Sequence, residues 1–135
     1  ATPRDTNNWQ DRTPSPHREI PAKNDDQRSA KQAPVWPVFV KNFRECAPGC
    51  VPISYHAYRN SAGRTCHKSG RAIDVHGMEC RGTTYRSIDK GRFKQMVQCM
   101  KKKMRVLYEN GSGDATKSHK DHAHFSIRCH NGSYI

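Results

Sequence analysis

The chain has 135 residues, a length that fits one domain, and its 24 Lys and Arg residues against 12 Asp and Glu give a formal charge of +12. Only 33% of the residues are hydrophobic, Leu107 is the only leucine, and no apolar run approaches the roughly 20 residues that a bilayer span needs. These numbers exclude a membrane protein, a leucine-rich bundle and a coiled coil.

Residues 1–34 differ in composition from the rest of the chain. They contain five prolines, six basic residues, five acidic residues and few apolar side chains. Burial of so little apolar surface cannot offset the entropy that is lost when a backbone is ordered. We therefore expect an extended or disordered arm over 1–34 and a single folded domain over 35–135, which carries most of the positive charge.

Residues 35–135 show the pattern of short strands around one helix. The run at 35–43 has strand-like residues, and Pro37 would confine it to an edge strand or to the start of a strand. Further strands are expected at 51–55, 72–75, 105–108 and 123–129. The main helix is expected over 87–103, with Ser87 as its cap, because five apolar residues recur at spacings of three and four: Phe93, Met96, Val97, Met100 and Met104. The pattern predicts an α+β domain with a small antiparallel sheet and one main helix.

Six cysteines indicate disulfide bonds that staple a small core, and they occupy positions 46, 50, 66, 80, 99 and 129. The pairing cannot be chosen from the sequence. The alternative is a structural zinc site with Cys46-x3-Cys50 as its first half. The chain begins at Ala1 without a charged-then-apolar leader, as expected of a mature exported protein. We expect a secreted or periplasmic location.

Five of the eight histidines lie in two short windows. In the first window His67 and Asp74 are seven positions apart, and a turn near Gly70 could aim both side chains at one site. In the second window His122 and His124 stand at i and i+2 of an expected strand, so their side chains would share one face. The two windows together predict one pocket that holds imidazoles and a carboxylate.

Two histidines, one aspartate and a water molecule make up the ligand set of a catalytic zinc site. We assign His67, Asp74 and His124 as the zinc ligands and Asp121 as the carboxylate that takes the proton of the bound water. His122 would orient the water or stabilise the oxyanion, and its role could be exchanged with that of His124. Cobalt and manganese also suit such a ligand set.

These motifs, His-x6-Asp followed by Asp-x-x-His ending in His-x-His, resemble the LAS zinc peptidases. That superfamily includes D-alanyl-D-alanine peptidases, bacterial and phage peptidoglycan endopeptidases, and the signalling domain of Hedgehog. Its signature Ser-x-His-x-x-Gly-x-Ala-x-Asp is similar to the stretch that ends at Asp74, with Thr65 in place of the serine. The resemblance covers about residues 53–128 and implies a Hedgehog-like fold, zinc bound by His67, Asp74 and His124, and Asp121 as general base.

The resemblance also implies an arginine that binds a carbonyl or carboxylate of the substrate. Arg59, in the pair Tyr58-Arg59 upstream of the first ligand, occupies that place, and Arg64 or Arg71 could supply the cation instead. Glu79 is the alternative base if Asp121 points away. The remaining histidines are interpreted as surface or supporting groups: His17, His56, His76, His119 and His130.

The function expected from these features is a secreted zinc peptidase that hydrolyses amide bonds in peptidoglycan stem peptides or cross-bridges, as a carboxypeptidase or an endopeptidase. Its expected partners are peptidoglycan and, through the positive charge, anionic wall polymers, and we expect a monomer. Nucleic acid is not favoured, because no binding motif and no basic stretch interleaved with aromatic residues is present. The alternatives are a non-catalytic, zinc-stabilised wall-binding module and a basic metal-dependent nuclease.

Overall fold

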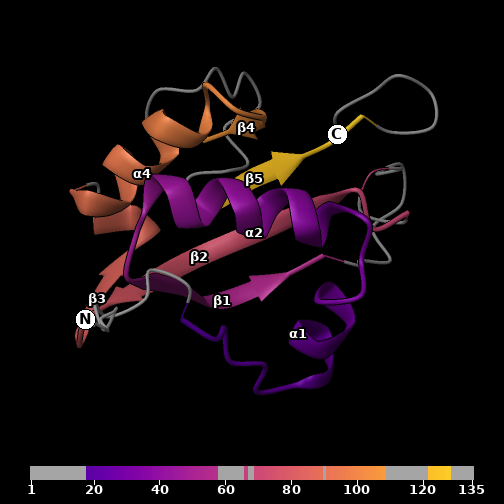
Figure 1. The fold of residues 1–135 in the computed structure, drawn as a ribbon, viewed down its shortest axis with the longest axis horizontal. Coiled ribbons are helices and arrows are strands. Elements are labelled where there is room, and N and C mark those ends of the chain that lie inside the picture. The colour runs from indigo at the N-terminus through magenta and orange to yellow at the C-terminus, as the bar shows by residue number, and fades with distance from the viewer. Residues whose placement is uncertain (1–17, 58–65, 67–68, 90, 109–121, 129–135) are drawn as a thin grey trace, which may run out of the picture.

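The computed structural model describes residues 18–57, 66, 69–89, 91–108 and 122–128. In this part of the chain, helices pack against an antiparallel sheet of five strands (Figure 1). The helices are α1 (Asp25–Ala30), α2 (Val35–Cys46) and α4 (Arg92–Met100), and a 3₁₀ turn, η1 (Ser87–Asp89), precedes α4. The strands are β1 (Cys50–His56), β2 (Ala72–Cys80), β3 (Thr83–Arg86), β4 (Arg105–Leu107) and β5 (Ala123–Ser126). The predicted α+β class and antiparallel sheet are confirmed.

The sheet has the order β1-β2-β5-β4, and β3 also pairs with β2. The strands predicted at 51–55, 72–75, 105–108 and 123–129 all correspond to strands of the structure, although β2 extends to Cys80. The sequence analysis missed β3, which returns along β2 after the two-residue turn Arg81-Gly82. Both turn residues have positive φ, 53° at Arg81 and 92° at Gly82, as a tight hairpin requires. Arginine at the first turn position is not a usual signal for such a hairpin.

The strand predicted over 35–43 is wrong, because this segment forms the helix α2. Pro37 lies in the first turn of the helix, where backbone N–H groups have no partner within the helix, so the missing N–H costs little. Phe39, Val40 and Phe43 are buried, which matches the spacing of three and four of a helix. Pro37 and Lys41, two residues on either side of Phe39, are exposed, whereas a strand would place them on the same face as Phe39. The described part of the domain therefore has two main helices, α2 and α4, and not one.

The helix predicted over 87–103 is present in its central part as α4, Arg92–Met100. Its buried face consists of the apolar residues that predicted it, Phe93, Met96, Val97 and Met100, with Met104 partly buried beyond its end. Ser87 does not cap this helix, because it lies in η1 and Gly91 is the N-cap residue.

Residues 18–34 differ from the extended or disordered arm predicted for them. Asn24 caps α1 by accepting a hydrogen bond from the backbone N–H of Gln27 at 2.9 Å, and Ile20 and Ala30 are buried in the core. The Tyr55 hydroxyl donates to the carbonyl of Pro21 at 2.7 Å. This segment thus lies against β1, beside which α1 is drawn in Figure 1. Residues 1–17 lie outside the described residues.

The apolar core lies between the sheet and the helices α2 and α4. The Phe39 ring of α2 lies 5.3 Å from the Phe125 ring of β5, and the Trp36 ring lies 5.4 Å from the Tyr55 ring of β1. Ile73 and Val75 of β2 are also buried in this cluster. One face of the sheet therefore packs against the helices and forms the apolar core.

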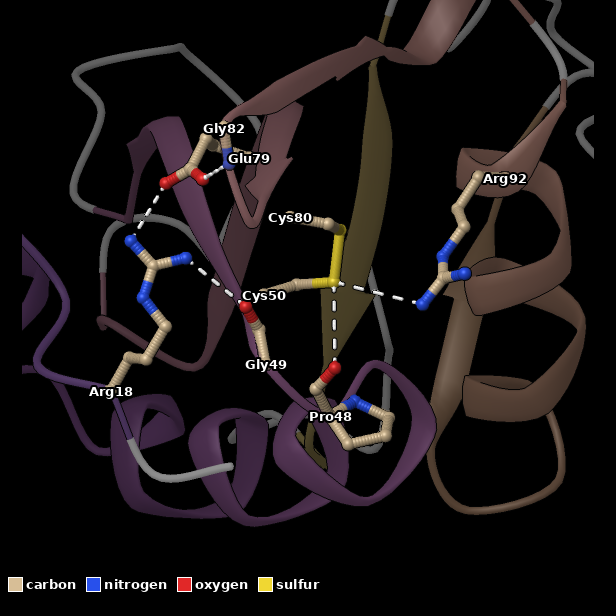
Figure 2. The surroundings of a disulfide bond; sticks show 8 residues. All are labelled: Arg18, Pro48, Gly49, Cys50, Glu79, Cys80, Gly82 and Arg92. Atoms are coloured by element: carbon tan, nitrogen blue, oxygen red, sulfur yellow. Dashed lines mark hydrogen bonds and ion pairs between the residues drawn. A yellow bond between two sulfur atoms is a disulfide. The ribbon is translucent and has the colours of Figure 1, made fainter. Parts of the chain in front are cut away.

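Disulfide bonds join the helices to each other and two strands to each other, as the cysteine content predicts. Cys46 at the end of α2 is bonded to Cys99 in α4, and Cys50 of β1 is bonded to Cys80 of β2 (Figure 2). Cys66 is disulfide-bonded as well, and its partner lies outside the described residues. The alternative of a zinc site built on Cys46 and Cys50 is wrong, because each sulfur is already in a covalent bond.

None of the helices in the described part of the chain has the length and apolar character needed to cross a membrane.

Candidate functional site

The pairing of three strands places a carboxylate between two imidazoles. In the register of the sheet, Asp74 of β2 lies directly opposite His56 of β1 on one side and directly opposite His124 of β5 on the other. Residues that are directly opposite in an antiparallel ladder project from the same face and have neighbouring Cβ atoms. The backbone alone therefore brings these three side chains into one row.

The Asp74 carboxylate contacts three histidines. Its Oδ1 atom lies 3.1 Å from Nδ1 of His124, and its Oδ2 atom lies 3.1 Å from Nε2 of His56. Nε2 of His122 lies 3.7 Å from the same Oδ2. The side chains of Asp74 and His124 are 2% and 1% exposed, whereas those of His122 and His56 are 13% and 22% exposed. Asp74 and His124 thus form the buried floor of the site, and His56 and His122 form its more accessible rim.

These side chains lie on the face of the sheet opposite to the one that packs against α2 and α4. Ile73, Val75 and Phe125 point into the core, so the intervening Asp74 and His124 point the other way. His122 and His124 reach the same carboxylate, and the sharing of one face predicted for this pair is confirmed. The turn expected near Gly70 is also present, with φ of 72° at that residue.

His76 joins the group because it lies two residues after Asp74 on β2, and side chains at i and i+2 of a strand share one face. β2 is also irregular beside β1 at this residue. Val75 pairs with Tyr55 and Gly77 pairs with Ser54, so His76 is an extra residue on β2 between two consecutive pairs. Such a bulge redirects side chains and is frequent beside functional sites. The His76 ring lies 5.0 Å from the His122 ring and 5.7 Å from the His56 ring, between centroids.

We call this group the Asp74 cluster, and its members are His56, Asp74, His76, His122 and His124. A buried carboxylate is tolerated only when it is paired or hydrogen-bonded, and here the partners are imidazoles. The same pairing is consistent with an aspartate–histidine network that needs no metal. The cluster therefore combines one acidic group with several bases that can each accept or donate a proton.

The donor set of the cluster suits a zinc ion. Zinc in proteins is bound by imidazole nitrogen and carboxylate oxygen at about 2.0–2.2 Å, so two ligands of a tetrahedral ion lie about 3.3 Å apart. The 3.1 Å between Asp74 Oδ1 and His124 Nδ1 is close to this value. Within the described ranges, no set of three or more His, Cys, Asp or Glu side chains is arranged to hold a metal ion. The third predicted ligand, His67, lies outside those ranges.

Three of the six predicted site residues, Asp74, His122 and His124, are described, and they lie together. The other three, Arg59, His67 and Asp121, lie outside the described residues. Glu79, the alternative base, lies toward the opposite end of β2, where it accepts a hydrogen bond from Arg18 at 2.7 Å. The guanidinium of Arg71, one alternative for Arg59, donates to the carbonyl of Arg128 at 3.0 Å.

The sequence analysis did not find that His56 belongs to the site. Nothing in the chain near His56 resembles a ligand motif, and its contact with Asp74 depends on the register between β1 and β2. Because residues 57–71 connect these strands, no short hairpin turn reveals that register. The signal available in the sequence was the strand predicted at 51–55, which His56 follows directly.

Comparison of the chain with protein-family models, with curated proteins and with solved structures found no match.

Proposed function

We propose that this protein is a secreted zinc-dependent peptidase that hydrolyses amide bonds in the peptides of bacterial peptidoglycan. The observation that carries the proposal is the buried carboxylate of Asp74 in contact with His124 and His122, on a sheet face that is separate from the core. The resemblance of both sequence motifs to the LAS zinc peptidases supports the same function. The predicted ligand set is His67, Asp74 and His124.

When bound, zinc supplies an activated water molecule and polarises the scissile carbonyl. The burial of Asp74 and His124 keeps water away from their contact and holds both side chains in one orientation. In this proposal Asp121 accepts a proton from the attacking water and delivers it to the leaving amine. Arg59 holds a carbonyl or carboxylate of the substrate.

In this proposal His122 contacts the substrate and does not bind the zinc ion. Its Nε2 lies 3.7 Å from Asp74 Oδ2, and its side chain is more exposed than those of Asp74 and His124. An imidazole at the rim can donate a hydrogen bond to the oxyanion that forms during amide hydrolysis. This arrangement favours His124 over His122 as the zinc ligand.

The disulfides support a location outside the cytoplasm, since such bonds persist in oxidising compartments. Peptidoglycan is accessible there. The formal charge of +12 would also attract the chain to anionic wall polymers by long-range electrostatics.

The proposal is tested with Asp74→Asn, which keeps the size of the side chain and removes its charge. We expect the variant to lose bound zinc, measured by elemental analysis of the purified protein, and to lose the release of new amino groups from purified murein. Glu45→Gln is the matched control, because Glu45 lies on α2 and pairs with Lys103, away from the cluster. It should keep both zinc and cleavage.

Two results would overturn the proposal. Wild-type protein that binds zinc and murein without releasing amino groups is a binding module and not a peptidase. Wild-type protein that nicks a plasmid in a chelator-sensitive manner and leaves murein intact is a nuclease. Asp121→Ala then separates chemistry from metal binding, because it should keep zinc and lose murein cleavage.

A further inference from the structure

The positive charge of the described chain is concentrated in the helices that cover the core. We define the helical layer as α2, α4 and residues 101–104, which follow α4. This layer contains seven basic residues, three of them in the run Lys101–Lys103, and a single acidic residue, Glu45. The five strands contain two arginines and two acidic residues, so apart from their histidines they carry no net charge. The helical layer is therefore a basic surface on a sheet that is electrically balanced.

The single acidic residue of the layer is already paired. Oε1 of Glu45 lies 2.8 Å from Nζ of Lys103. The hydrogen bond from Lys103, together with the charges of Lys103 and Lys41, holds the pKa of the Glu45 carboxyl below its ordinary value of 4.5. Lys41 and Lys102 are exposed, and neither forms an ion pair within the ranges that the structure describes. Their charges remain available to an anion from outside.

The cations of the two helices belong to one surface. The disulfide between Cys46 and Cys99 joins the end of α2 to α4, with 5.6 Å between the Cα atoms. Lys102 is next in sequence to the Lys103 that pairs with Glu45, and Lys41 lies one helical turn before Glu45 on α2. Figure 1 shows α2 and α4 on the same side of the sheet.

A groove runs along α2 beside these cations. It has a volume of about 540 Å³, and its lining in the described part of the chain consists of Trp36, Pro37, Val40, Lys41, Arg44 and Glu45. Arg44 is held at this wall by a hydrogen bond from its guanidinium to the carbonyl of Arg18 at 3.2 Å. A sugar ring has a face of C–H groups that packs on flat apolar rings such as those of tryptophan and proline. The groove thus combines such rings with positive charge, as a site for an anionic sugar requires.

We propose that the helical layer binds an acidic polysaccharide, with sugar rings in the groove beside Trp36 and carboxylate or phosphate groups on Lys41 and Lys102. The disulfides favour an oxidising compartment outside the cytoplasm, which favours a surface polysaccharide over a nucleic acid as the polyanion. The Asp74 cluster lies on the opposite face of the sheet, so the polymer is a partner that retains the protein and not its substrate. The inference does not depend on the proposed peptidase function.

The test measures the binding of polygalacturonate, with neutral dextran as the uncharged control. The fluorescence of Trp36 reports occupation of the groove in a Trp9→Phe background, because Trp9 is the only other tryptophan. Polygalacturonate should bind and change the emission of Trp36, more weakly as the salt concentration rises, whereas dextran should leave the emission unchanged.

A pair of double variants with the same net charge locates the site. Lys41→Gln with Lys102→Gln should weaken the binding of polygalacturonate about tenfold, the combined effect of two exposed ion pairs. Lys23→Gln with Arg128→Gln removes two exposed cations outside the helical layer and should leave the affinity within about twofold of that of the wild type. Circular dichroism checks that both variants are folded.

Equal weakening in the two double variants would overturn the site, because net charge alone would then account for binding. Absence of polygalacturonate binding, or binding without a change in Trp36 emission, would also overturn it. Tighter binding of single-stranded DNA than of polygalacturonate at the same salt concentration would overturn the choice of a polysaccharide. Asp74→Asn should bind polygalacturonate as the wild type does, so a failure of the peptidase proposal leaves this result intact.

Discussion

Asp74 is the residue on which the geometry of the site depends, because its two oxygens are oriented by different strands. Oδ1 faces His124 of β5 and Oδ2 faces His56 of β1, each at 3.1 Å. A carboxylate held by two partners loses rotational freedom before any ligand binds, and pre-orientation of this kind raises the affinity for a metal. His56 is thus a positioning residue for Asp74.

The contribution of His56 is tested by two substitutions. His56→Ala should lower zinc affinity about tenfold or more, because it removes the 3.1 Å contact that orients Oδ2 of Asp74, whereas His56→Gln should restore most of the affinity through its amide donor. Competition with a chromophoric chelator measures the affinity. Equal zinc binding by the wild type and His56→Ala contradicts the positioning role, and thermal unfolding in the presence of chelator shows whether each variant is folded.

Glu79 lies at the opposite end of β2 from the cluster, and its contacts lead us to expect that the stability of the fold depends on pH. The hydrogen bond from Arg18 and then that from the Gly82 N–H lower the pKa of the Glu79 carboxyl below its ordinary value of 4.5 (Figure 2). The Glu79 carboxylate therefore binds a proton less readily in the folded state than in the unfolded state. The ionised carboxylate stabilises the folded state fully above about pH 4.5, and this stabilisation is lost as the pH falls further.

Glu79→Gln should remove this part of the acid sensitivity. Between about pH 5 and about pH 3 the melting temperature of the wild type should fall more steeply than that of Glu79→Gln, measured by circular dichroism. Arg18→Gln should also flatten the curve, because the main cause of the lowered pKa is then absent. Parallel curves for the wild type and Glu79→Gln would contradict the argument.

β2 is the element that connects the site to the rest of the fold. It pairs with β1, β3 and β5, carries Asp74 and His76, and ends in the disulfide to β1. In the β1–β2 ladder, the Cys50–Cys80 pair stands at one end and the His56–Asp74 pair at the other. The disulfide therefore stabilises the strand pair without contacting the cluster.

Removal of each disulfide should lower the free energy of unfolding by about 3 kcal/mol, because the unfolded chain gains conformational freedom. The double variants are Cys50→Ala with Cys80→Ala, and Cys46→Ala with Cys99→Ala, measured by urea unfolding. Since both disulfides lie away from the Asp74 cluster, zinc affinity at temperatures where the variants are folded should remain that of the wild type. A loss of affinity comparable to that of His56→Ala would contradict this separation.

At the scale of the whole molecule, the described residues that stabilise the fold and those that form the candidate site lie on opposite faces of one sheet. The helices α2 and α4 lie over one face of the sheet (Figure 1) and bury the aromatic core there. The Asp74 cluster lies on the other face. Substitutions that change the site therefore need not disturb the core. This division explains why charged and titratable groups are tolerated in a domain with so few apolar residues.

Much of the local structure was predictable from the sequence alone. Strand-like residues marked the four strands at 51–55, 72–75, 105–108 and 123–129, and a spacing of three and four marked the apolar face of α4, because these signals depend on neighbours within a few residues. The cysteine content indicated the disulfides, and the His-x-His spacing placed His122 and His124 on one face. Each of these features follows from covalent geometry or from composition.

Long-range packing decided the rest. Residues 35–43 have strand-like side chains but become helical because Phe39, Val40 and Phe43 then lie on one face and pack in one core against the sheet. Residues 18–34 are ordered by contacts with β1 that their own composition does not reveal. The membership of His56 in the site depends on strand register, which is set by pairing between distant segments. The sequence by itself determined which chemical groups were available, and only the tertiary structure decided which of them meet.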